Sequence, residues 1–213
     1  MANPFARPAF NFKTPRVLLR TATESDAAAF HKHLINPANT PHQPTEDDLT
    51  IEQVLRRIAY FEKVTIEGKH GWIIFESRET GDFLGYGGYN CFEEVDAEEF
   101  LGTKPNSPGT KYLADWGIMM DHKYWGKGYA REIAICLIEY ARSLGCGLFR
   151  TETDVDNEAW KGLMKGIGLA AFEQRGKASY DETKELLTWK WDVDTWEKAK
   201  AKLQGEGRWT DLA

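Results

Sequence analysis

Residues 115–130, Asp115-Trp-Gly-Ile-Met-Met-Asp-His-Lys-Tyr-Trp-Gly-Lys-Gly-Tyr-Ala130, run from an apolar segment through a glycine turn into a helical pattern. Gly126 and Gly128 let the main chain approach a ligand without a clash from a β-carbon. The first residues of a helix carry N–H groups without partners inside the helix, together with partial positive charge. The stretch therefore predicts a strand, a turn and a helix N-terminus that suits a phosphate.

Two common phosphate-binding motifs do not fit this turn. A Walker A loop needs four residues between its first glycine and a final Gly-Lys-Ser/Thr, which this turn lacks. A dinucleotide fingerprint needs a third glycine where the chain has Arg131, and the candidate ribose-binding acids Glu152 and Asp154 come late. The turn is therefore a phosphate loop of another kind, or a plain glycine turn before a helix.

The turn resembles the acyl-CoA pyrophosphate loop of the GCN5-related N-acetyltransferase (GNAT) superfamily, whose pattern is Gln/Arg-x-x-Gly-x-Gly/Ala followed by a helix. Trp125 stands at the Gln/Arg position, and Tyr-Trp-Gly-Lys-Gly-Tyr-Ala is a common form in the RimJ/RimL-like subfamily. A second motif, Asn157-x-x-Trp-x-x-Leu-Met-x-x-Ile-Gly-Leu169, is similar to the family's Asn-x-x-Ser/Ala-x-x-Leu-Tyr-x-x-x-Gly-Phe, with matching spacing. The resemblance covers roughly residues 15–192.

The hydrophobic pattern predicts alternating strands and helices. We expect strands over 16–23, 71–76, 83–90, 115–120 and 148–154, with one or two final strands over 179–191. We expect helices over 26–35, 50–68, 128–144, 157–168 and 195–203. This order predicts a mixed α/β fold with helices on both faces of a sheet. The resemblance implies the GNAT type, a mostly antiparallel twisted sheet that splays between its fourth and fifth strands.

The chain of 213 residues is long enough for one domain with a sizeable core. We expect an extended arm over 1–14, a GNAT acetyltransferase domain over 15–192, and a terminal helix with a loose tail over 193–213. Residues 93–110 carry five acids and read as a long acidic loop. That loop is either simply solvated or a substrate lid that attracts a cationic amine.

Composition limits the partners. The chain is 42% hydrophobic and 28% charged, as expected of a soluble globular protein, and its net charge of −6 argues against nucleic-acid binding. No stretch approaches the roughly 18 consecutive apolar residues that span a membrane. Cys91, Cys136 and Cys146 form no metal-type pair and indicate reduced thiols, while His31 and His33 face different ways on a helix. We therefore expect a cytoplasmic protein without a metal.

The resemblance implies acetyl-CoA as the co-substrate. It implies that backbone N–H groups of residues 126–130 hold the pyrophosphate, with Lys127 nearby, and that main-chain groups of residues 118–120 pair with the pantetheine arm. Asn157 commonly reaches the pantetheine in this family and is equally a plain helix cap. The implied cofactor-binding residues are Ile118, Met119, Met120, Trp125, Gly126, Lys127, Gly128, Tyr129, Ala130 and Asn157.

The chemistry needs a group that takes a proton from the amine. The resemblance makes Asp115 the candidate catalytic residue, because it corresponds to an acidic residue at the start of the fourth strand in RimJ/RimL-like proteins. Its carboxylate could take the proton directly or through water, orient the substrate, or lie on the surface. Many relatives supply an acid for the thiolate from a tyrosine where this chain has Met164; Tyr180 or Tyr129 could substitute.

We therefore predict an acetyl-CoA-dependent N-acetyltransferase that transfers the acetyl group directly to a primary amine, either a protein N-terminus or a small molecule. The alternative is a non-catalytic acyl-CoA-binding sensor, which Trp160 and Met164 at polar family positions keep open. The sequence does not identify the acceptor. We expect its pocket to be shaped by the His42-Gln-Pro44 loop, the second helix and the acidic loop. The chain is a monomer or a homodimer, since its 13% aromatic content suits a dimer interface or a dense core.

Overall fold

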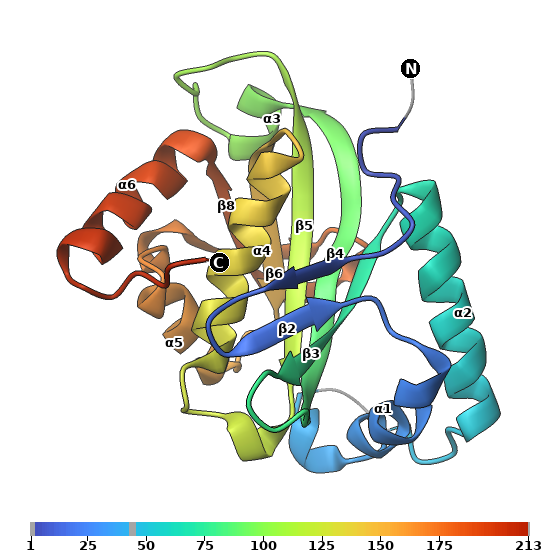
Figure 1. Ribbon diagram of the computed structural model, residues 1–213. Helices are drawn as coiled ribbons and strands as arrows, with labels where there is room; N and C mark the ends of the chain where they lie inside the picture. Colours follow the sequence, from blue (N-terminus) through green and yellow to red (C-terminus); the bar gives the residue numbers. More distant parts are fainter. Residues whose placement is uncertain (1–2, 43–45, 213) are drawn as a thin grey trace. The chain divides into compact units, whose positions relative to one another are not determined.

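The computed structural model in Figure 1 describes residues 3–42 and 46–212. Its strands are β1 (Asn11–Lys13), β2 (Val17–Arg20), β3 (Gly71–Ser77), β4 (Phe83–Asp96), β5 (Thr110–Met120), β6 (Cys146–Thr153), β7 (Glu173–Ala178) and β8 (Asp181–Asp192). Its α-helices are α1 (Ala27–Leu34), α2 (Ile51–Glu67), α3 (Ala97–Leu101), α4 (Tyr129–Ser143), α5 (Glu158–Gly166) and α6 (Val193–Gly205). Short 3-10 turns are η1 (Glu24–Asp26), η2 (Pro37–Asn39), η3 (His122–Tyr124) and η4 (Ala170–Phe172).

The chain divides into two compact units. The first unit comprises Met1–Asn90, Gly117–Ile133 and Asp211–Ala213. The second unit comprises Cys91–Trp116 and Ala134–Thr210. Strands β4 and β5 and helix α4 contribute residues to both units, and each unit has its own hydrophobic core.

In the first unit, β1, β2, β3 and β4 pair in chain order, and each pair is antiparallel. Helix α2 begins at the predicted cap, where the Thr50 hydroxyl accepts from the Gln53 N–H, and it ends at Gly68 with φ of 69°. Aromatic rings fill the core between α1, α2 and the sheet; Phe61 stacks on Trp72 with ring centroids 4.9 Å apart. This packing fixes the two helices that precede β3.

Glycines in β4 allow β5 to come close. A β-carbon at Gly85 would lie 2.2 Å from the Met119 carbonyl oxygen, and one at Gly87 would lie 2.2 Å from the Gly117 carbonyl oxygen. The carbonyls of Gly117 and Met119 therefore lie against β4. Because main-chain groups alternate in direction along a strand, those of Ile118 point to the opposite edge.

In the second unit, the first part of β5 pairs with β6 in parallel, β6 pairs with β8 antiparallel, and β8 pairs with β7 antiparallel. Large aromatic side chains fill the core of this unit, and Trp116, Trp189, Trp191, Trp196 and Phe149 are at most 1% exposed. The β5–β6 ladder ends at the pair Asp115 and Arg150. One residue further, the Thr151 hydroxyl donates to the Trp116 carbonyl at 2.8 Å.

The predicted fold class is confirmed. The structure is mixed α/β, its sheet is mostly antiparallel with β5 and β6 as a parallel pair, and helices surround it as in the GNAT fold. The helices α1, α2, α4, α5 and α6 begin and end within two residues of the predicted bounds.

The acidic segment 93–110 is not simply a loop. Strand β4 continues to Asp96, and α3 follows directly. The Asp96 side chain caps α3 by accepting from the N–H groups of Glu98 and Glu99, while Ala97 and Phe100 are buried. The prediction of a loop was wrong for 93–101 because the density of charge concealed a helix cap and a short apolar face.

Both end segments of the described chain contain packed side chains. The arm contains β1, and Phe5 and Phe10 are buried. The cap of helix α6 is Asp192, whose side chain accepts from the Thr195 N–H. Asp194, the predicted cap, lies within the first turn of the helix instead. Beyond it, Trp209 packs on Trp196 with ring centroids 6.2 Å apart, so the segment after 203 is packed. None of the helices in the described part of the chain combines the length and apolar character needed to cross a membrane.

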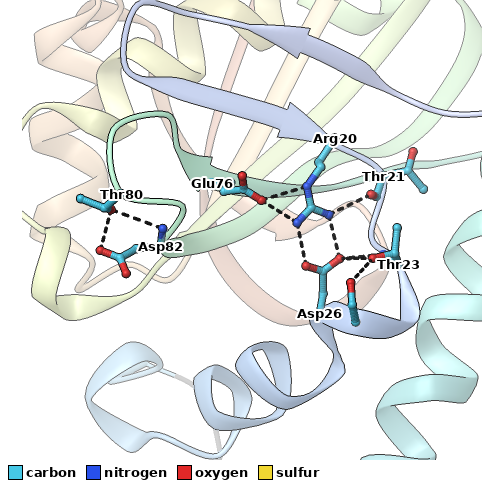
Figure 2. A network of polar contacts seen from close by, with 8 residues as sticks. Arg20, Thr21, Thr23, Asp26, Glu76, Thr80 and Asp82 are labelled. Carbon is cyan, nitrogen blue, oxygen red and sulfur yellow. Dashed lines mark hydrogen bonds and ion pairs between the residues drawn. The ribbon is translucent and has the colours of Figure 1, made fainter.

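An ionic network holds the start of α1 to the sheet of the first unit, as Figure 2 shows. Arg20 forms two 2.7 Å bonds to the Asp26 carboxylate and reaches Glu76 at 2.7 Å. Asp26 also accepts from the Thr23 N–H and is only 8% exposed. Although burial raises the pKa of Asp26, the bonds from Arg20 and Thr23 leave that pKa below its usual value.

Asp26→Asn is expected to lower the free energy of unfolding by about 2–3 kcal/mol at pH 7, because the Arg20 side chain loses a largely buried ionic partner. Chemical denaturation followed by circular dichroism measures this loss. Glu46→Gln is the matched control, because it breaks a pair in which Glu46 accepts two hydrogen bonds from Arg57. The Glu46 side chain is 42% exposed, so the expected loss in the free energy of unfolding is below about 1 kcal/mol. Equal losses in the two variants would contradict the prediction.

Candidate active site

The glycine turn of the first unit has the predicted strand–turn–helix form. After β5, the Asp121 side chain caps η3 by accepting from the Lys123 N–H. The Trp125 indole N–H donates to the Met120 carbonyl at 3.0 Å. Gly126 and Gly128 then adopt φ of 71° and 79°, a left-handed conformation that other residues rarely take. Helix α4 begins directly afterwards at Tyr129.

The turn is open to a ligand. Trp125 is 44% exposed, the next three residues are also exposed, and a β-carbon at Gly126 would meet no atom within 4 Å. Exposed main chain at the N-terminus of a 15-residue helix fits an anionic group such as a pyrophosphate. Among the predicted pantetheine partners, the Met120 carbonyl is occupied by Trp125 and that of Met119 lies against β4. Ile118 therefore keeps the best-directed main-chain groups.

An ion pair between the buried Glu132 and the half-exposed Arg16 braces this turn, and neither residue was predicted to support it. Glu132, in the first turn of α4, is 3% exposed and accepts from the Arg16 side chain at 2.7 Å and the Arg16 N–H at 2.9 Å. The Thr14 hydroxyl bonds to the same carboxylate. Arg16 also donates to the Lys127 carbonyl at 3.1 Å and lies over the Tyr129 ring, 4.4 Å from its centroid. We call these contacts of Arg16 and Glu132 the brace, and they hold the glycine turn in place.

A second set of contacts ties η2 to the start of η3 in the first unit. Asn39 is buried, and its side-chain oxygen accepts from the His122 N–H at 2.8 Å. Its amide nitrogen lies 3.0 Å from both the ring nitrogen and the carbonyl of His33. Burial lowers the pKa of His33 to about 4, so this ring is neutral at pH 7. Of the loop predicted to shape the acceptor pocket, Gln43 and Pro44 lie outside the described residues.

The neutral, buried His33 should make stability depend on pH. An unfolded histidine takes a proton near pH 6.5 and the folded one only near 4, so stability is fully present above about pH 6.5 and falls as the pH drops toward 4, by up to about 3 kcal/mol. Denaturation at pH 7 and pH 4.5 measures the loss. We expect His33→Gln to lose less stability than wild type over this interval, and exposed His42→Gln to match wild type. Parallel pH curves for all three proteins would refute the assignment.

Asp115 lies in the second unit and is only 4% exposed, so it is not a surface strand residue. Its carboxylate accepts from the Arg150 Nε at 2.5 Å, and the Arg150 Nη2 lies 3.9 Å from the Cys91 sulfur. Burial lowers the pKa of Arg150, but Asp115 more than compensates, so that pKa is above its usual value. A permanent cation thus sits beside the candidate catalytic carboxylate.

Cys91 and Cys136 are poorly suited to act as nucleophiles. Burial, reinforced by the charge of Asp115, raises the pKa of the Cys91 thiol to about 12, so that it stays protonated at neutral pH. Cys136 is buried in α4, as expected of a core residue. No group of three or more His, Cys, Asp or Glu side chains within the described ranges could hold a metal ion.

Asn157 caps α5, because its side-chain oxygen accepts from the Trp160 N–H at 3.0 Å and its amide donates to the Thr153 hydroxyl at 2.8 Å. The helix-cap interpretation is therefore confirmed, and contact with pantetheine stays a prediction. Met164 is fully buried and Trp160 is 9% exposed. Both belong to the core of the second unit. Of the possible substitute acids, Tyr180 is 69% exposed, whereas the ring of Tyr129 lies under Arg16.

The mixed sheet and the glycine turn before α4 are those expected of an acetyltransferase, and comparison with known proteins tests this class. The acetyltransferase (GNAT) domain model matches residues 16–170, so the chain belongs to the GNAT acetyltransferase family. A relative in sequence, the uncharacterized N-acetyltransferase YoaA of Bacillus subtilis (strain 168), is 27% identical over 167 residues, which are 77% of this chain and 83% of the relative.

Solved structures share the fold. Mycobacterium smegmatis RimJ in complex with a CoA disulfide gives a TM-score of 0.66 at 14% identity and covers 98% of each chain. RimL, a ribosomal L7/L12 alpha-N-protein acetyltransferase in complex with coenzyme A, gives 0.63 at 16% identity and covers 85% of this chain and 97% of its own. The predicted family and the enzyme class of N-acetyltransferase are thus confirmed, and the RimJ and RimL structures show that the fold is shared.

Proposed function

We propose that this protein binds acetyl-CoA and transfers its acetyl group directly to a primary amine, without a covalent enzyme intermediate. The observation that carries the proposal is the braced glycine turn at the start of α4. Its exposed main chain, its left-handed glycines and the fixed Lys127 carbonyl give a rigid anion-binding surface, within the part of the chain that matches the GNAT model. A rigid surface binds a ligand with little ordering cost.

Residues of the first unit hold the cofactor in this proposal. The N–H groups from Gly126 to Ala130 bind the pyrophosphate, and Lys127 adds a positive charge on an exposed side chain. Ile118 offers the pantetheine arm main-chain groups that point away from β4, with Met119 and Met120 continuing the strand. Trp125 flanks the turn, its indole fixed by the Met120 carbonyl. From the second unit, Asn157 is proposed as a further pantetheine contact.

Asp115 is proposed to take the proton from the attacking amine, directly or through a water molecule. Its ionic bond to Arg150 fixes the carboxylate in place, and the buried surroundings strengthen its interaction with a positively charged amine. After transfer, the CoA thiolate is a tolerable leaving group because a thiol has a pKa near about 8.5. The reaction therefore does not require an acidic side chain at the position of the buried Met164.

The acceptor class follows from the cost of freeing the amine. A lysine-type amine, with a pKa of about 10.4, costs over about 4 kcal/mol to deprotonate at neutral pH, whereas an α-amine costs about 1 kcal/mol. An ion-paired carboxylate is better suited to the α-amine, because the deprotonation of an α-amine costs less free energy. The α-amino activity named for RimL supports the same choice. We therefore place α-amines first among acceptors, ahead of polyamines.

The sensor alternative gains nothing from the structure. Trp160 and Met164 motivated it because they replace polar family residues, but both are core side chains of the second unit. Apolar residues at these positions follow from packing. The enzyme proposal therefore stands without a second candidate.

Calorimetric titration with acetyl-CoA, followed by incubation with α-amino peptides, polyamines and amino sugars, tests the proposal. We expect binding, release of CoA thiol with an α-amine, and a product that is heavier by one acetyl group. Propionyl-CoA and succinyl-CoA serve as competitors that identify the donor. Absence of acetyl-CoA binding by the folded protein would overturn the proposal, and binding without transfer to any amine would return the sensor alternative.

A further inference from the structure

The second unit carries a basic hollow that none of the proposed cofactor-binding residues lines. A cavity of about 370 Å³ lies over β6, β7 and β8. Its lining holds four cationic side chains and a single acid, Glu152, in a protein whose net charge is −6. The cations are Arg150, Arg175, Lys177 and Lys190. Such a concentration of one sign in a concave surface attracts anions.

Strand register brings two of these cations, Arg150 and Lys190, to one face. Arg150 pairs with Lys190, and Glu152 pairs with Thr188, in the antiparallel β6–β8 ladder, and residues directly opposite share a face. The β7–β8 ladder places Gln174 beside Thr188. The opposite face of the same strands carries the buried aromatic core, including Phe149 and Trp191. The polar face of β6 and β8 is therefore one wall of the hollow, and Arg175 and Lys177 line it from the edge strand β7.

Two of the cations are without an acidic partner. Arg150 is paired with Asp115, and Arg175 with Glu185 at 2.8 Å. Lys177 and Lys190 form no ion pair within 4 Å in residues 3–42 and 46–212, and Lys190 instead lies 5.1 Å from the Phe100 ring centroid. The one acid is engaged: Glu152 accepts from the Ser179 N–H and hydroxyl, at 3.1 and 2.8 Å, which also holds the β7–β8 turn in place. Positive charge thus remains available to a ligand.

We propose that this basic hollow binds an oxyanion group, a carboxylate or a phosphate, on the acceptor amine. The inference rests on the proposed function and names the class of its substrate. Arg150 makes the link to the chemistry, since its Nε holds Asp115 while its side chain lines the hollow. An acceptor whose acidic group occupies the hollow is anchored next to the Asp115–Arg150 pair, and a neutral amine lacks that anchor.

Matched acceptors test the proposal. Alanyl-alanine is compared with its C-terminal amide, and glucosamine 6-phosphate with glucosamine, which separates carboxylate from phosphate. We expect kcat/KM to be about ten- to a hundredfold higher for the acidic member of at least one pair, because a hydrogen bond between charged groups strengthens binding by about that factor. Lys190→Gln and Lys177→Gln should each reduce this preference at least about fivefold through KM, while acetyl-CoA affinity is unchanged. Lys198→Gln, an exposed change on α6 with the same loss of charge, should behave as wild type.

A binding experiment makes the result independent of turnover. Inorganic phosphate is titrated into isotopically labelled protein, and the amide resonance of Gly176, which lines the hollow, is expected to shift to saturation in wild type and Lys198→Gln but weakly in Lys190→Gln. No transfer to any amine, with saturable phosphate binding, would refute the proposed function alone. Equal rates for acidic and neutral acceptors, a preference that survives both lysine changes, or loss of acetyl-CoA affinity in them would overturn the basic hollow as the acceptor's anion site.

Discussion

Asp115→Asn is expected to lower kcat/KM for acetyl transfer by at least about 100-fold, with acetyl-CoA affinity within about twofold of wild type. Proton transfer by a positioned side chain contributes about 10²- to 10⁴-fold, and the amide cannot take a proton. The carboxylate is 4% exposed and bonded to Arg150, so water replaces it poorly. Steady-state kinetics with the best acceptor and calorimetry with acetyl-CoA measure the two quantities.

The same change removes the ionic partner of Arg150, whose side chain is 14% exposed, and is expected to cost about 3 kcal/mol of stability. The pH dependence separates chemistry from folding. If Asp115 takes the proton from the ammonium form, the defect shrinks as the pH rises above the pKa of the acceptor, near about 8 for an α-amine. A purely structural defect is constant with pH. Glu206→Gln, which breaks the exposed pair with Arg208, is the control and should leave kcat unchanged.

Local patterns in the sequence predicted most of the fold. Thr50 and Asn157 are caps that act within three residues, and Gly68 ends α2 in the left-handed conformation that glycine favours. The glycine turn before α4 is likewise a local feature, since its conformation is written in Gly126 and Gly128. Short elements in charged sequence were missed. Helix α3 needs only Asp96 as a cap and a buried Ala97 and Phe100, too few positions for a periodic signal.

Only part of the candidate site could be predicted from the sequence, because the contacts that support it join residues far apart along the chain. Arg16 and Glu132 are 116 residues apart in sequence, and an acid in the first turn of a helix is common because it complements the helix dipole. Glu132 therefore gave no sign that it is buried. Asp115 was found through a family resemblance, whereas its ionic bond to Arg150 depends on the parallel β5–β6 register, which the sequence pattern did not specify.

Glu132→Gln is expected to raise the dissociation constant of acetyl-CoA about tenfold or more and to lower the free energy of unfolding by about 1–2 kcal/mol. The variant leaves Arg16 without its buried ionic partner, and Arg16 is the residue that bonds the Lys127 carbonyl and covers Tyr129. A freed turn must be ordered by the ligand, which lowers affinity without removing any group that contacts it. Calorimetry with acetyl-CoA and chemical denaturation measure the two effects.

Glu139→Gln supplies the control for Glu132→Gln because it removes another ion-paired glutamate from α4. Glu139 bonds Arg142 and Lys200 and is also partly buried, but it lies in the second unit, ten residues beyond the start of α4 at Tyr129. We expect a comparable loss of stability with unchanged acetyl-CoA affinity. Arg16→Lys should fall between wild type and Glu132→Gln in affinity, since lysine keeps the charge but not the forked geometry that reaches both Glu132 and the turn. Equal affinities in all four proteins would mean that the turn holds its conformation without the brace, through its glycines and the Trp125 indole alone.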